Sequence, residues 1–329
     1  STSHPFAFAN SVEEIAGVEI TDRCKYIRSI IAELERLHSH LLWVGLAGHF
    51  LGYNTVFMWA WKYREPVLDL FEMITGNRNS YAKFKVVGVR RDIENHKIPA
   101  IAKVLALVKK KTDMLVGAVM DDPVIHARTK GVGVLTRQDI LDYAAVGPTA
   151  RASGIDIDVR RDDPYAAYPL VNWKVITAEA GDVFAKAEVR LLEMYESISI
   201  IEQCLEGLKK EKEGELDVKV KHIPVGFGTG HAEAPRGEVF HFVVSDGSNT
   251  PARHKIRAPS YTNIATFKKS CVGQSISDAT ISLAAVDPCY CCTERLAVAL
   301  DRRSGQRIMN AKEIISHSAS ITNKLLQQE

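Results

Sequence analysis

Three of the six cysteines fall close together near the end of the chain, at Cys289, Cys291 and Cys292. Cys289 and Cys292 form a CxxC pair, and this spacing lets two thiolates bind one metal ion from a turn or from the start of a helix. The pair supplies only half of a tetrahedral site. A redox-active dithiol and a pair of small buried residues fit the same pattern, so the motif alone leaves three interpretations open.

A second candidate for chemistry is Arg236, which stands between Pro235 and Gly237 directly before a stretch typical of a β-strand. An arginine held in this way presents a planar fork of N–H donors, as the recognition of an anion or a polarised ligand requires. An exposed arginine in a turn has the same sequence pattern. Tyr261 and Asn263, further along the chain, carry no specific signal by themselves.

The composition is that of an ordinary soluble globular protein of 329 residues, with 46% hydrophobic and 25% charged residues. The 42 basic and 40 acidic residues leave a net charge of +2, so no overall field favours nucleic acid as a partner. Six cysteines are too few for a secreted disulfide framework, and the first ten residues lack the pattern of a signal peptide. We therefore expect an intracellular protein in a reducing compartment.

Apolar residues recur at three- and four-residue steps from Ile27 to Leu41, which predicts a helix with one buried face. The stretch 41–61 that follows carries no formal charge and is long enough to cross a bilayer. Its three glycines, its central polar residues and the charged segment before it favour a bundle helix, broken near Gly52, over a membrane span.

Helical patterns continue through the first two-thirds of the chain and predict further helices at 64–76, 92–115, 136–144 and 178–208. A stretch rich in Gly, Pro and charged residues interrupts them near 147–177, and it fits either a functional loop or a solvated one.

The fold class that these patterns predict is mainly α, with an antiparallel helical bundle over 1–212. A small α+β segment over 213–272 is expected to contain a hairpin of two strands, 239–247 and 254–260. The remaining segment, 273–329, carries the CxxC motif and a polar helical tail.

Seven blocks of sequence, taken together, resemble a known family. They are HSHLLWVG at 38–45, WKYREPVLDLFEMITGNR at 61–78, VGVRRDI at 87–93, GPTARASGIDIDVRRDDPYAAY at 147–168, EAPRGEVFHFVVSDG at 233–247, RAPSYTN at 257–263 and DPCYCCTER at 287–295. Their order resembles the large subunit of nickel–iron hydrogenases, above all the membrane-bound, energy-converting branch (group 4). That branch shares ancestry with the hydrogenase-like quinone-module subunit of respiratory complex I. Many blocks occur in both relatives, and the DPCxxC motif favours the hydrogenases because complex I subunits have lost the nickel ligands there.

The resemblance implies a role for each matching residue. Cys289 would be a terminal nickel ligand and Cys292 would bridge nickel and iron, since a redox-active nickel needs soft thiolate donors. Arg236 would stand over the two metals, with Asp287 paired to it or holding it in place. Ser260 would donate a hydrogen bond to the cyanide or carbon monoxide that iron carries in this family. Cys291 matches no ligand position.

The beginning of the sequence departs from the family pattern. The family supplies two more nickel thiolates from an upstream motif, Arg-x-Cys-Gly-x-Cys-x-x-x-His, and His4 matches only its last position. By resemblance, His4 would donate a hydrogen bond to the sulfur of Cys292. We expect the two further cysteine ligands in a preceding segment, and we expect the 329 residues alone to fold without a stable nickel–iron centre.

The resemblance implies reversible hydrogen oxidation and proton reduction, with electrons passed to an iron–sulfur cluster in a small partner subunit. Membrane-arm subunits would be contacted indirectly, which makes this a peripheral protein on the cytoplasmic side of the membrane. One alternative is a complex I-like subunit, in which the helical cleft houses quinone or shapes the partner interface. Another is a non-catalytic subunit with an incomplete metal site. In several branches of the family a tail equivalent to 296–329 is removed after nickel insertion.

Overall fold

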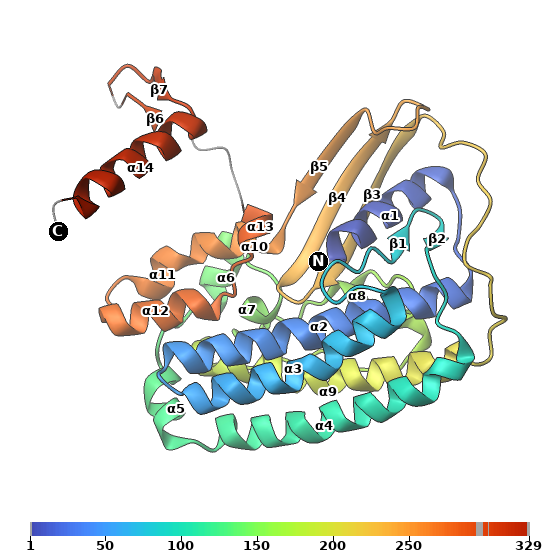
Figure 1. Ribbon diagram of the computed structural model, residues 1–329, viewed down its shortest axis with the longest axis horizontal. Coiled ribbons are helices and arrows are strands. Elements are labelled where there is room, and N and C mark those ends of the chain that lie inside the picture. The colour runs from blue at the N-terminus through green and yellow to red at the C-terminus, as the bar shows by residue number, and fades with distance from the viewer. Residues whose placement is uncertain (1, 294–298, 302, 328–329) are drawn as a thin grey trace. The chain divides into compact units, whose positions relative to one another are not determined.

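The computed structural model of the protein describes residues 2–293, 299–301 and 303–327. Residues Ser1–Pro288 form one compact unit and Cys289–Glu329 form a second, and each is described by itself. The first unit is mainly helical with a small antiparallel sheet towards its C-terminal end (Figure 1), which confirms the predicted mainly helical class and the small β-containing segment. No helix in the described part of the chain is long and apolar enough to cross a membrane.

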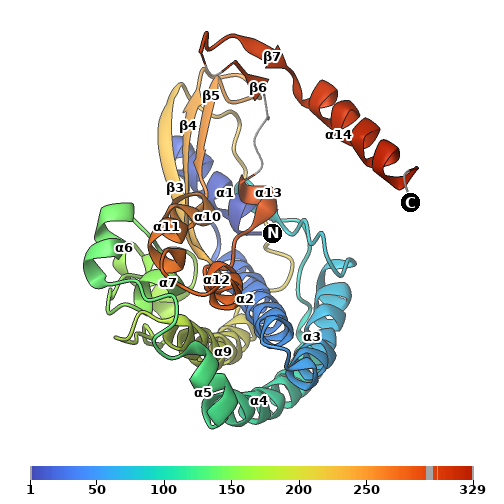
Figure 2. The ribbon, with the colours of Figure 1, turned by 90° about the vertical axis from the view of Figure 1, so that its left-hand side faces the viewer.

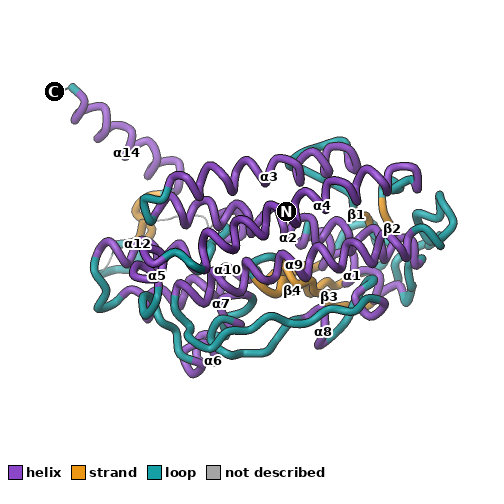
Figure 3. The backbone as a smooth tube through the Cα atoms, turned by 90° about the horizontal axis from the view of Figure 1, so that it is seen from below, coloured by secondary structure: helices purple, strands orange, loops and turns teal. Residues whose placement is uncertain are grey.

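Four long helices make the core of the first unit. Helix α2 packs on α3 and α9, and α4 packs on the same two helices from the other side. Figure 3 shows them lying lengthwise beside one another. Their bounds are α2 (Asp22–Phe50), α3 (Asn54–Thr75), α4 (Ile98–Met120) and α9 (Val183–Leu208). The apolar stripe predicted on α2 is buried from Ile27 to Leu41, so burial of this face stabilises the bundle.

The apolar stretch 41–61 is divided between two bundle helices rather than forming a membrane span. Helix α2 ends at Phe50 and α3 begins at Asn54, with Gly52 between them at φ +79°, which confirms the predicted break. The helix predicted at 64–76 is not separate, because α3 runs without interruption from Asn54. It ends where predicted, at Gly76, whose φ of +82° is the left-handed conformation of a helix C-cap.

The helix predicted from Asp92 begins later, at Ile98. Asp92 is used outside the helix, because its Oδ1 accepts a hydrogen bond from Nε of Arg23 at 2.8 Å. Pro99 then takes the first turn of α4, where its missing N–H costs nothing. The helix predicted at 136–144 is α6, and Thr136 caps its start with a capping box.

Short elements connect the long helices or follow the sheet at the end of the first unit. They are β1 (Phe84–Lys85), β2 (Gly88–Val89), η1 (Asn95–Lys97), α5 (Pro123–Thr129), α6 (Arg137–Tyr143), α7 (Pro148–Arg151), α8 (Val159–Asp162), η2 (Tyr168–Leu170), α10 (Pro259–Asn263), η3 (Ile264–Thr266), α11 (Phe267–Cys271) and α12 (Ile276–Ala285).

Strands β1 and β2 form a two-stranded antiparallel sheet, and the larger sheet of the first unit has three antiparallel strands in the order β3 (Gly226–Ala234), β4 (Gly237–Ser245) and β5 (Arg253–Arg257). Helix α1 (Ser3–Ala16) packs on β3 and β4 (Figure 2). The hairpin of β4 and β5 confirms the prediction, but neither β3 nor α1 was predicted from the sequence.

Strand β3 escapes sequence analysis because glycine replaces the alternating apolar residues of an ordinary strand. The structure shows what these glycines do. A Cβ atom at Gly228 would lie 2.3 Å from the carbonyl oxygen of Ser11, and one at Gly230 would lie 2.3 Å from that of Ala7. The glycines therefore let the backbone of α1 approach the strand.

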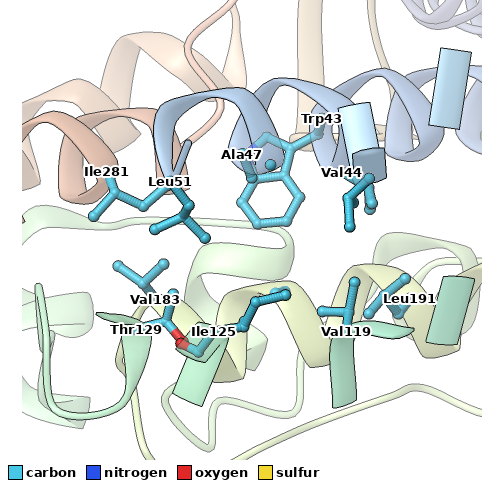
Figure 4. Close-up of a pocket in the computed structure, with 13 residues that line it drawn as sticks. Trp43, Val44, Ala47, Leu51, Val119, Ile125, Thr129, Val183, Leu191 and Ile281 are labelled. Carbon is cyan, nitrogen blue, oxygen red and sulfur yellow. The ribbon is translucent and has the colours of Figure 1, made fainter. Parts of the chain in front are cut away.

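A small apolar cavity lies among the bundle helices (Figure 4). Its walls come from α2, α9, α5 and α12, and include Trp43, Ala47, Val183, Leu191 and Ile281. The lining contains no ionisable side chain, so this cavity offers neither a proton carrier nor a metal ligand. The candidate functional residues are polar side chains that lie outside this cavity.

The second unit has its own small elements. They are α13 (Tyr290–Thr293), an antiparallel pair of strands, β6 (Ala299–Leu300) and β7 (Arg307–Met309), and the helix α14 (Ala311–Leu326). The polar helical tail predicted at the end of the chain is α14.

Candidate functional site

Arg236 lies in the tight turn between β3 and β4, where it joins three parts of the first unit. Its Nε donates to the carbonyl oxygen of Asp287 at 2.8 Å, and its Nη2 donates to Oδ1 of the same residue at 2.9 Å. Its Nη1 donates to Oγ of Ser39 on α2 at 3.2 Å. The guanidinium is therefore fixed by a carboxylate and a hydroxyl, and the Arg236–Asp287 contact is the pairing that the resemblance implied.

Two residues outside the turn hold its backbone in place. Nδ2 of Asn263 donates to the carbonyl oxygen of Arg236 at 3.1 Å, while Oδ1 of Asn263 accepts from the N–H of Val146 at 2.9 Å. Gly147 packs so closely that a Cβ atom there would lie 2.4 Å from the carbonyl oxygen of Arg236. Asn263 had no signal of its own in the sequence, because its role depends on neighbours that are distant along the chain.

We expect Gly147→Ala to destabilise the protein more than Gly131→Ala. Both glycines have a positive φ, +70° and +72°, and Gly147 combines it with a ψ of −151°, a region of backbone conformation that is essentially restricted to glycine. Only Gly147 also meets the backbone of Arg236, whereas the space beside Gly131 is open. Thermal unfolding followed by circular dichroism measures the difference. Equal losses in the two variants would show that the turn around Arg236 is not tightly packed.

Asp287 itself has an uncommon conformation and an unused acceptor. Its φ is +58°, a left-handed value that aspartate tolerates better than most residues, and it follows directly after the end of α12. The residue is only 8% exposed. Its Oδ2 has no hydrogen-bond partner among the described residues. A buried carboxylate oxygen in this state is ready to accept a hydrogen bond from a ligand or a water molecule.

Arg190 is a fully buried cation with unused donors. Its Nη1 donates to the carbonyl oxygen of Lys186 at 2.8 Å, but neither Nε nor Nη2 has a partner among the described residues. The guanidinium carbon lies 4.4 Å from the ring centre of Trp43. Burial lowers the pKa of Arg190 to about 10, although the negative charge of Asp287 opposes this shift. Arg190 therefore remains a cation at neutral pH.

Arg190 is a functional candidate that sequence analysis missed. It lies inside the amphipathic pattern of 178–208, where a single arginine is typical of a solvated face. Trp43, whose ring covers it, is fixed by a hydrogen bond from Nε1 to the carbonyl oxygen of Ala284 at 2.9 Å. The unused donors of Arg190 and the unused acceptor of Asp287 thus belong to one electrostatically coupled cluster.

A buried network of charged side chains holds the turn that carries Arg236. Arg36 on α2 donates from Nη2 to the carbonyl oxygen of Glu233 at 2.6 Å. Arg151 donates from Nη1 to Oε1 of Glu233 at 2.8 Å and from Nε to Oε1 of Glu193 at 2.9 Å. Glu233 is the second-last residue of β3, the strand that leads into the Arg236 turn. The network therefore ties this turn to α2, α7 and α9.

The stretch 147–177 contributes to the same network and is not simply solvated. Arg160 donates from Nη2 to Oδ2 of Asp158 at 2.6 Å and from Nη1 to Oε1 of Glu33 at 3.0 Å. Arg151, Asp158 and Arg160 are at most 3% exposed. Burial, reinforced by the nearby charge of Asp158, raises the pKa of Glu233 above its usual range. Glu233 is therefore the acid of this network that protonates most readily.

The cysteine motif begins the second unit. Cys289 and Cys292 are half-buried and Cys291 is exposed. The N–H of Cys292 donates to the carbonyl oxygen of Cys289 at 3.0 Å, so the two residues are one helical turn apart. No group of three or more His, Cys, Asp or Glu in the described residues could hold a metal ion. The nickel-ligand roles assigned to Cys289 and Cys292 stay a prediction.

The other two residues named from the resemblance lie in the first unit. Ser260 is buried in the first turn of α10. His4 lies in the first turn of α1, with its Nδ1 at 3.0 Å from Nε2 of His241. The roles assigned to these residues toward a metal stay a prediction.

The family model that matches the chain is "Respiratory-chain NADH dehydrogenase, 49 Kd subunit", over residues 51–223 and 214–295. The chain belongs to this family. The matched residues include Arg190, Arg236 and Asp287, whereas Ser39 and Trp43 lie before the matched region.

The individual relatives include both hydrogenase subunits and NADH-quinone oxidoreductase subunits. The chain is 34% identical to the membrane-bound hydrogenase subunit alpha of Pyrococcus furiosus, over 99% of this chain and 79% of that protein. It is 33% identical to NADH-quinone oxidoreductase subunit 4 of Thermus thermophilus, over 88% of this chain and 76% of that protein. A solved structure of an archaeal membrane-bound sulfane sulfur reductase aligns with a TM-score of 0.81 and 30% identity, covering 86% of this chain and 78% of that one. The predicted kinship to both branches is confirmed, but the comparisons do not single out the hydrogenases.

Proposed function

We propose that the chain is the large peripheral subunit of a membrane-associated, energy-converting oxidoreductase of the complex I type, and that it receives electrons from an iron–sulfur partner subunit. The observation that carries this proposal is the family match over most of the chain. The names of the relatives describe different overall reactions, with hydrogen, quinone or sulfane sulfur. They share a setting in which electrons move through a multisubunit complex at a membrane. The match supports this complex I-like role better than hydrogen chemistry.

The side chains of the cluster suit a reaction in which an acceptor gains electrons. Two guanidinium nitrogens of buried Arg190 have no hydrogen-bond partner among the described residues, and buried donors stabilise negative charge far more strongly than donors in water do. The carbonyl oxygens of a quinone develop such charge when they are reduced. Asp287 holds Arg236 and offers a further acceptor. The subunit would lie on the cytoplasmic side of the membrane and contact the membrane arm through its partners.

Purification tests this proposal. The chain, tagged and expressed in its natural host, should be recovered from solubilised membranes together with a subunit that gives the electron paramagnetic resonance signal of a reduced iron–sulfur cluster. The complex should reduce a short-chain quinone when supplied with a low-potential donor. Recovery of the chain alone, without iron, would contradict the proposal. A heat-treated sample of the same preparation is the control for non-enzymatic reduction.

A second candidate function is nickel–iron hydrogenase, and a specific observation favours it. Cys289 and Cys292 follow closely after Asp287 in the sequence and keep the spacing of a thiolate pair. In this candidate Cys289 and Cys292 would hold a nickel–iron centre with carbon monoxide and cyanide on iron, and further thiolates would come from outside the described residues. Such a centre, when bound, supplies the cleavage of hydrogen. Arg236 and Asp287 would then orient polar groups beside it.

The cysteine variants separate the two candidates. Under the hydrogenase candidate, Cys289→Ser and Cys292→Ser each lose bound nickel because a neutral hydroxyl does not replace a thiolate, whereas Cys291→Ser keeps it. Under the complex I-like candidate, the three variants have the same metal content and the same quinone reductase rate. Elemental analysis of the purified complexes decides between these outcomes. Loss of nickel in Cys291→Ser alone would contradict the ligand assignment.

A further inference from the structure

Three histidines from three separate elements form a hydrogen-bonded chain in the first unit. Nδ1 of His4 on α1 lies 3.0 Å from Nε2 of His241 on β4, and Nδ1 of His241 lies 2.9 Å from Nε2 of His254 on β5. His241 is only 2% exposed, His4 is half-buried and His254 is exposed. The three rings therefore form a line that runs from exposed His254 on the edge strand through buried His241 to half-buried His4.

The fold fixes the positions of these rings. In the β4–β5 register His241 pairs with Ile256, and Val243 pairs with His254, so the two histidines are diagonal neighbours on one face of the sheet. Helix α1 packs on this sheet, and Oγ of Ser11 donates to the carbonyl oxygen of His241. The chain of histidines is thus built by regular secondary structure and not by a flexible loop.

The geometry is that of a proton chain and not of a metal site. Ligation of one ion by three histidines requires one nitrogen of each ring to face a common point. His241 instead uses its two nitrogens for two different neighbours. Each contact has the length of a hydrogen bond between a donor nitrogen and an acceptor nitrogen.

The electrostatic surroundings keep the rings neutral. Burial lowers the pKa of His241 to about 3, with further lowering from the neighbouring rings of His4 and His254. Burial also lowers the pKa of His4 and of His254. A neutral imidazole has one donor and one acceptor nitrogen, so all three rings can point their N–H groups in the same direction. A proton that enters such a chain does not remain on the buried ring.

The His4 end of the chain lies within the electrostatic influence of a buried carboxylate, Glu35. The hydroxyl groups of Thr2 and Ser3 donate to Glu35, and Glu35 is 5% exposed. Its negative charge opposes the effect of burial on the pKa of His4 and so attracts a proton to this end. His4 also belongs to the same turn of α1 as Ser3. The line of histidines therefore runs from the exposed ring of His254 to a ring that is under the electrostatic influence of buried Glu35.

We propose that His254, His241 and His4 conduct protons between solvent and the interior beside Glu35. A proton binds to Nδ1 of His254, the proton on its Nε2 passes to Nδ1 of His241, and the proton on Nε2 of His241 passes to Nδ1 of His4. One proton enters the chain for each proton that reaches His4, and no electron moves. Reorientation of the rings restores the starting tautomers. In the complete enzyme this route rests on the proposed function, because reduction of a quinone consumes protons.

A first experiment measures the proton chain without any enzyme turnover. Nuclear magnetic resonance of the full chain labelled with ¹⁵N-histidine gives the rate at which the imidazole N–H of buried His241 exchanges with solvent. We expect exchange to slow about ten-fold or more in His254→Phe, because this variant keeps an aromatic ring but removes the proton carrier. Equal exchange rates in the wild type and in His254→Phe would overturn the proposal.

A second experiment measures turnover of the purified complex with a quinone analogue. We expect His254→Gly to slow turnover about ten-fold or more, and added imidazole to restore most of the rate, because free imidazole can carry the proton in place of the missing ring. His222→Gly, at an exposed histidine outside the chain, is the matched control and should neither slow turnover nor respond to imidazole.

A third variant tests the chain at a second histidine, so that the result does not depend on how His254→Gly folds. His241→Gln keeps a polar side chain on β4 but has no imidazole to pass a proton on, so it should slow turnover without recovery in imidazole. A rate unchanged in both His254→Gly and His241→Gln would overturn the proposal. Absence of quinone reduction by the wild-type complex would instead contradict the proposed function, and the exchange measurement would still decide about the proton chain.

Discussion

Replacement of Arg151 by methionine is expected to lower the free energy of unfolding by about 3–5 kcal/mol, the range observed when one partner of a buried ion pair is removed. Arg151 is fully buried, and its donors contact Glu193 and Glu233 at 2.9 and 2.8 Å. Methionine fills a similar volume but leaves these carboxylates without their shared cation. Because most domains are stable by only about 5–15 kcal/mol, such a loss consumes a large part of the total.

The matched control is Arg161→Met in the same stretch of the chain. Arg161 contacts Asp156 and Asp162, but its side chain is 42% exposed and water screens the pairs. We expect this variant to lose less than about 1 kcal/mol. Denaturation in urea, followed by circular dichroism, gives both values. Similar losses in the two variants would contradict the buried network around Arg151.

In contrast to Arg151→Met, Arg190→Met is expected to slow the reaction strongly and to reduce the stability of the fold only moderately. Because two donors of Arg190 have no partner among the described residues, removing this charge gives up few hydrogen bonds, and the loss of stability should be well below that of Arg151→Met. Quinone reduction by the complex should nevertheless fall about 100-fold or more, as happens when a buried donor that stabilises developing charge is removed. The comparison separates a cation that supports the fold from one that serves the reaction.

Two measurements check this second prediction. Urea denaturation of the purified chain reports stability, and the steady-state rate of quinone reduction by the complex reports function, with Arg161→Met as the control for both. A variant that unfolds as readily as Arg151→Met but keeps its rate would assign Arg190 to the fold alone. If Arg190→Met lost both stability and rate, we would measure Arg190→Lys, which retains the charge. Recovery of stability without recovery of the rate would support the functional role of Arg190.

The bundle could be predicted because its helices bury apolar stripes of regular period. The buried ion network could not, since a sequence pattern counts charged residues as solvated. One signal was present: Glu33 lies three residues after Ile30 and four before Leu37, which places it on the apolar stripe of α2. In the structure this carboxylate accepts from the hydroxyls of Tyr168 and Ser197, both at 2.7 Å. A charged residue on the apolar stripe of a helix thus indicated that its side chain has a polar partner in the protein interior.

The candidate site also combines residues that the sequence indicated with residues that only the structure revealed. Arg236 stood out because proline and glycine flank it, and the structure places it in a turn in contact with Asp287. Arg190 has no such flanks, and only the three-dimensional packing of α9 shows that its donors are unused. His241 had a detectable signal, because it alternates with Val239 and Val243 on the buried face of β4. Its partners come from other elements, so the proton chain required the tertiary structure.

The central claim is that this chain forms the site at which electrons from an iron–sulfur partner reach their acceptor. The most direct test is the rate at which the reduced cluster of the purified complex is reoxidised by a quinone analogue, followed by freeze-quench electron paramagnetic resonance. We expect rapid reoxidation in the wild type and reoxidation slowed about 100-fold in Arg236→Lys, because an ammonium does not reproduce the planar fork that contacts Asp287 and Ser39. Reoxidation at the same rate in both complexes would contradict the account.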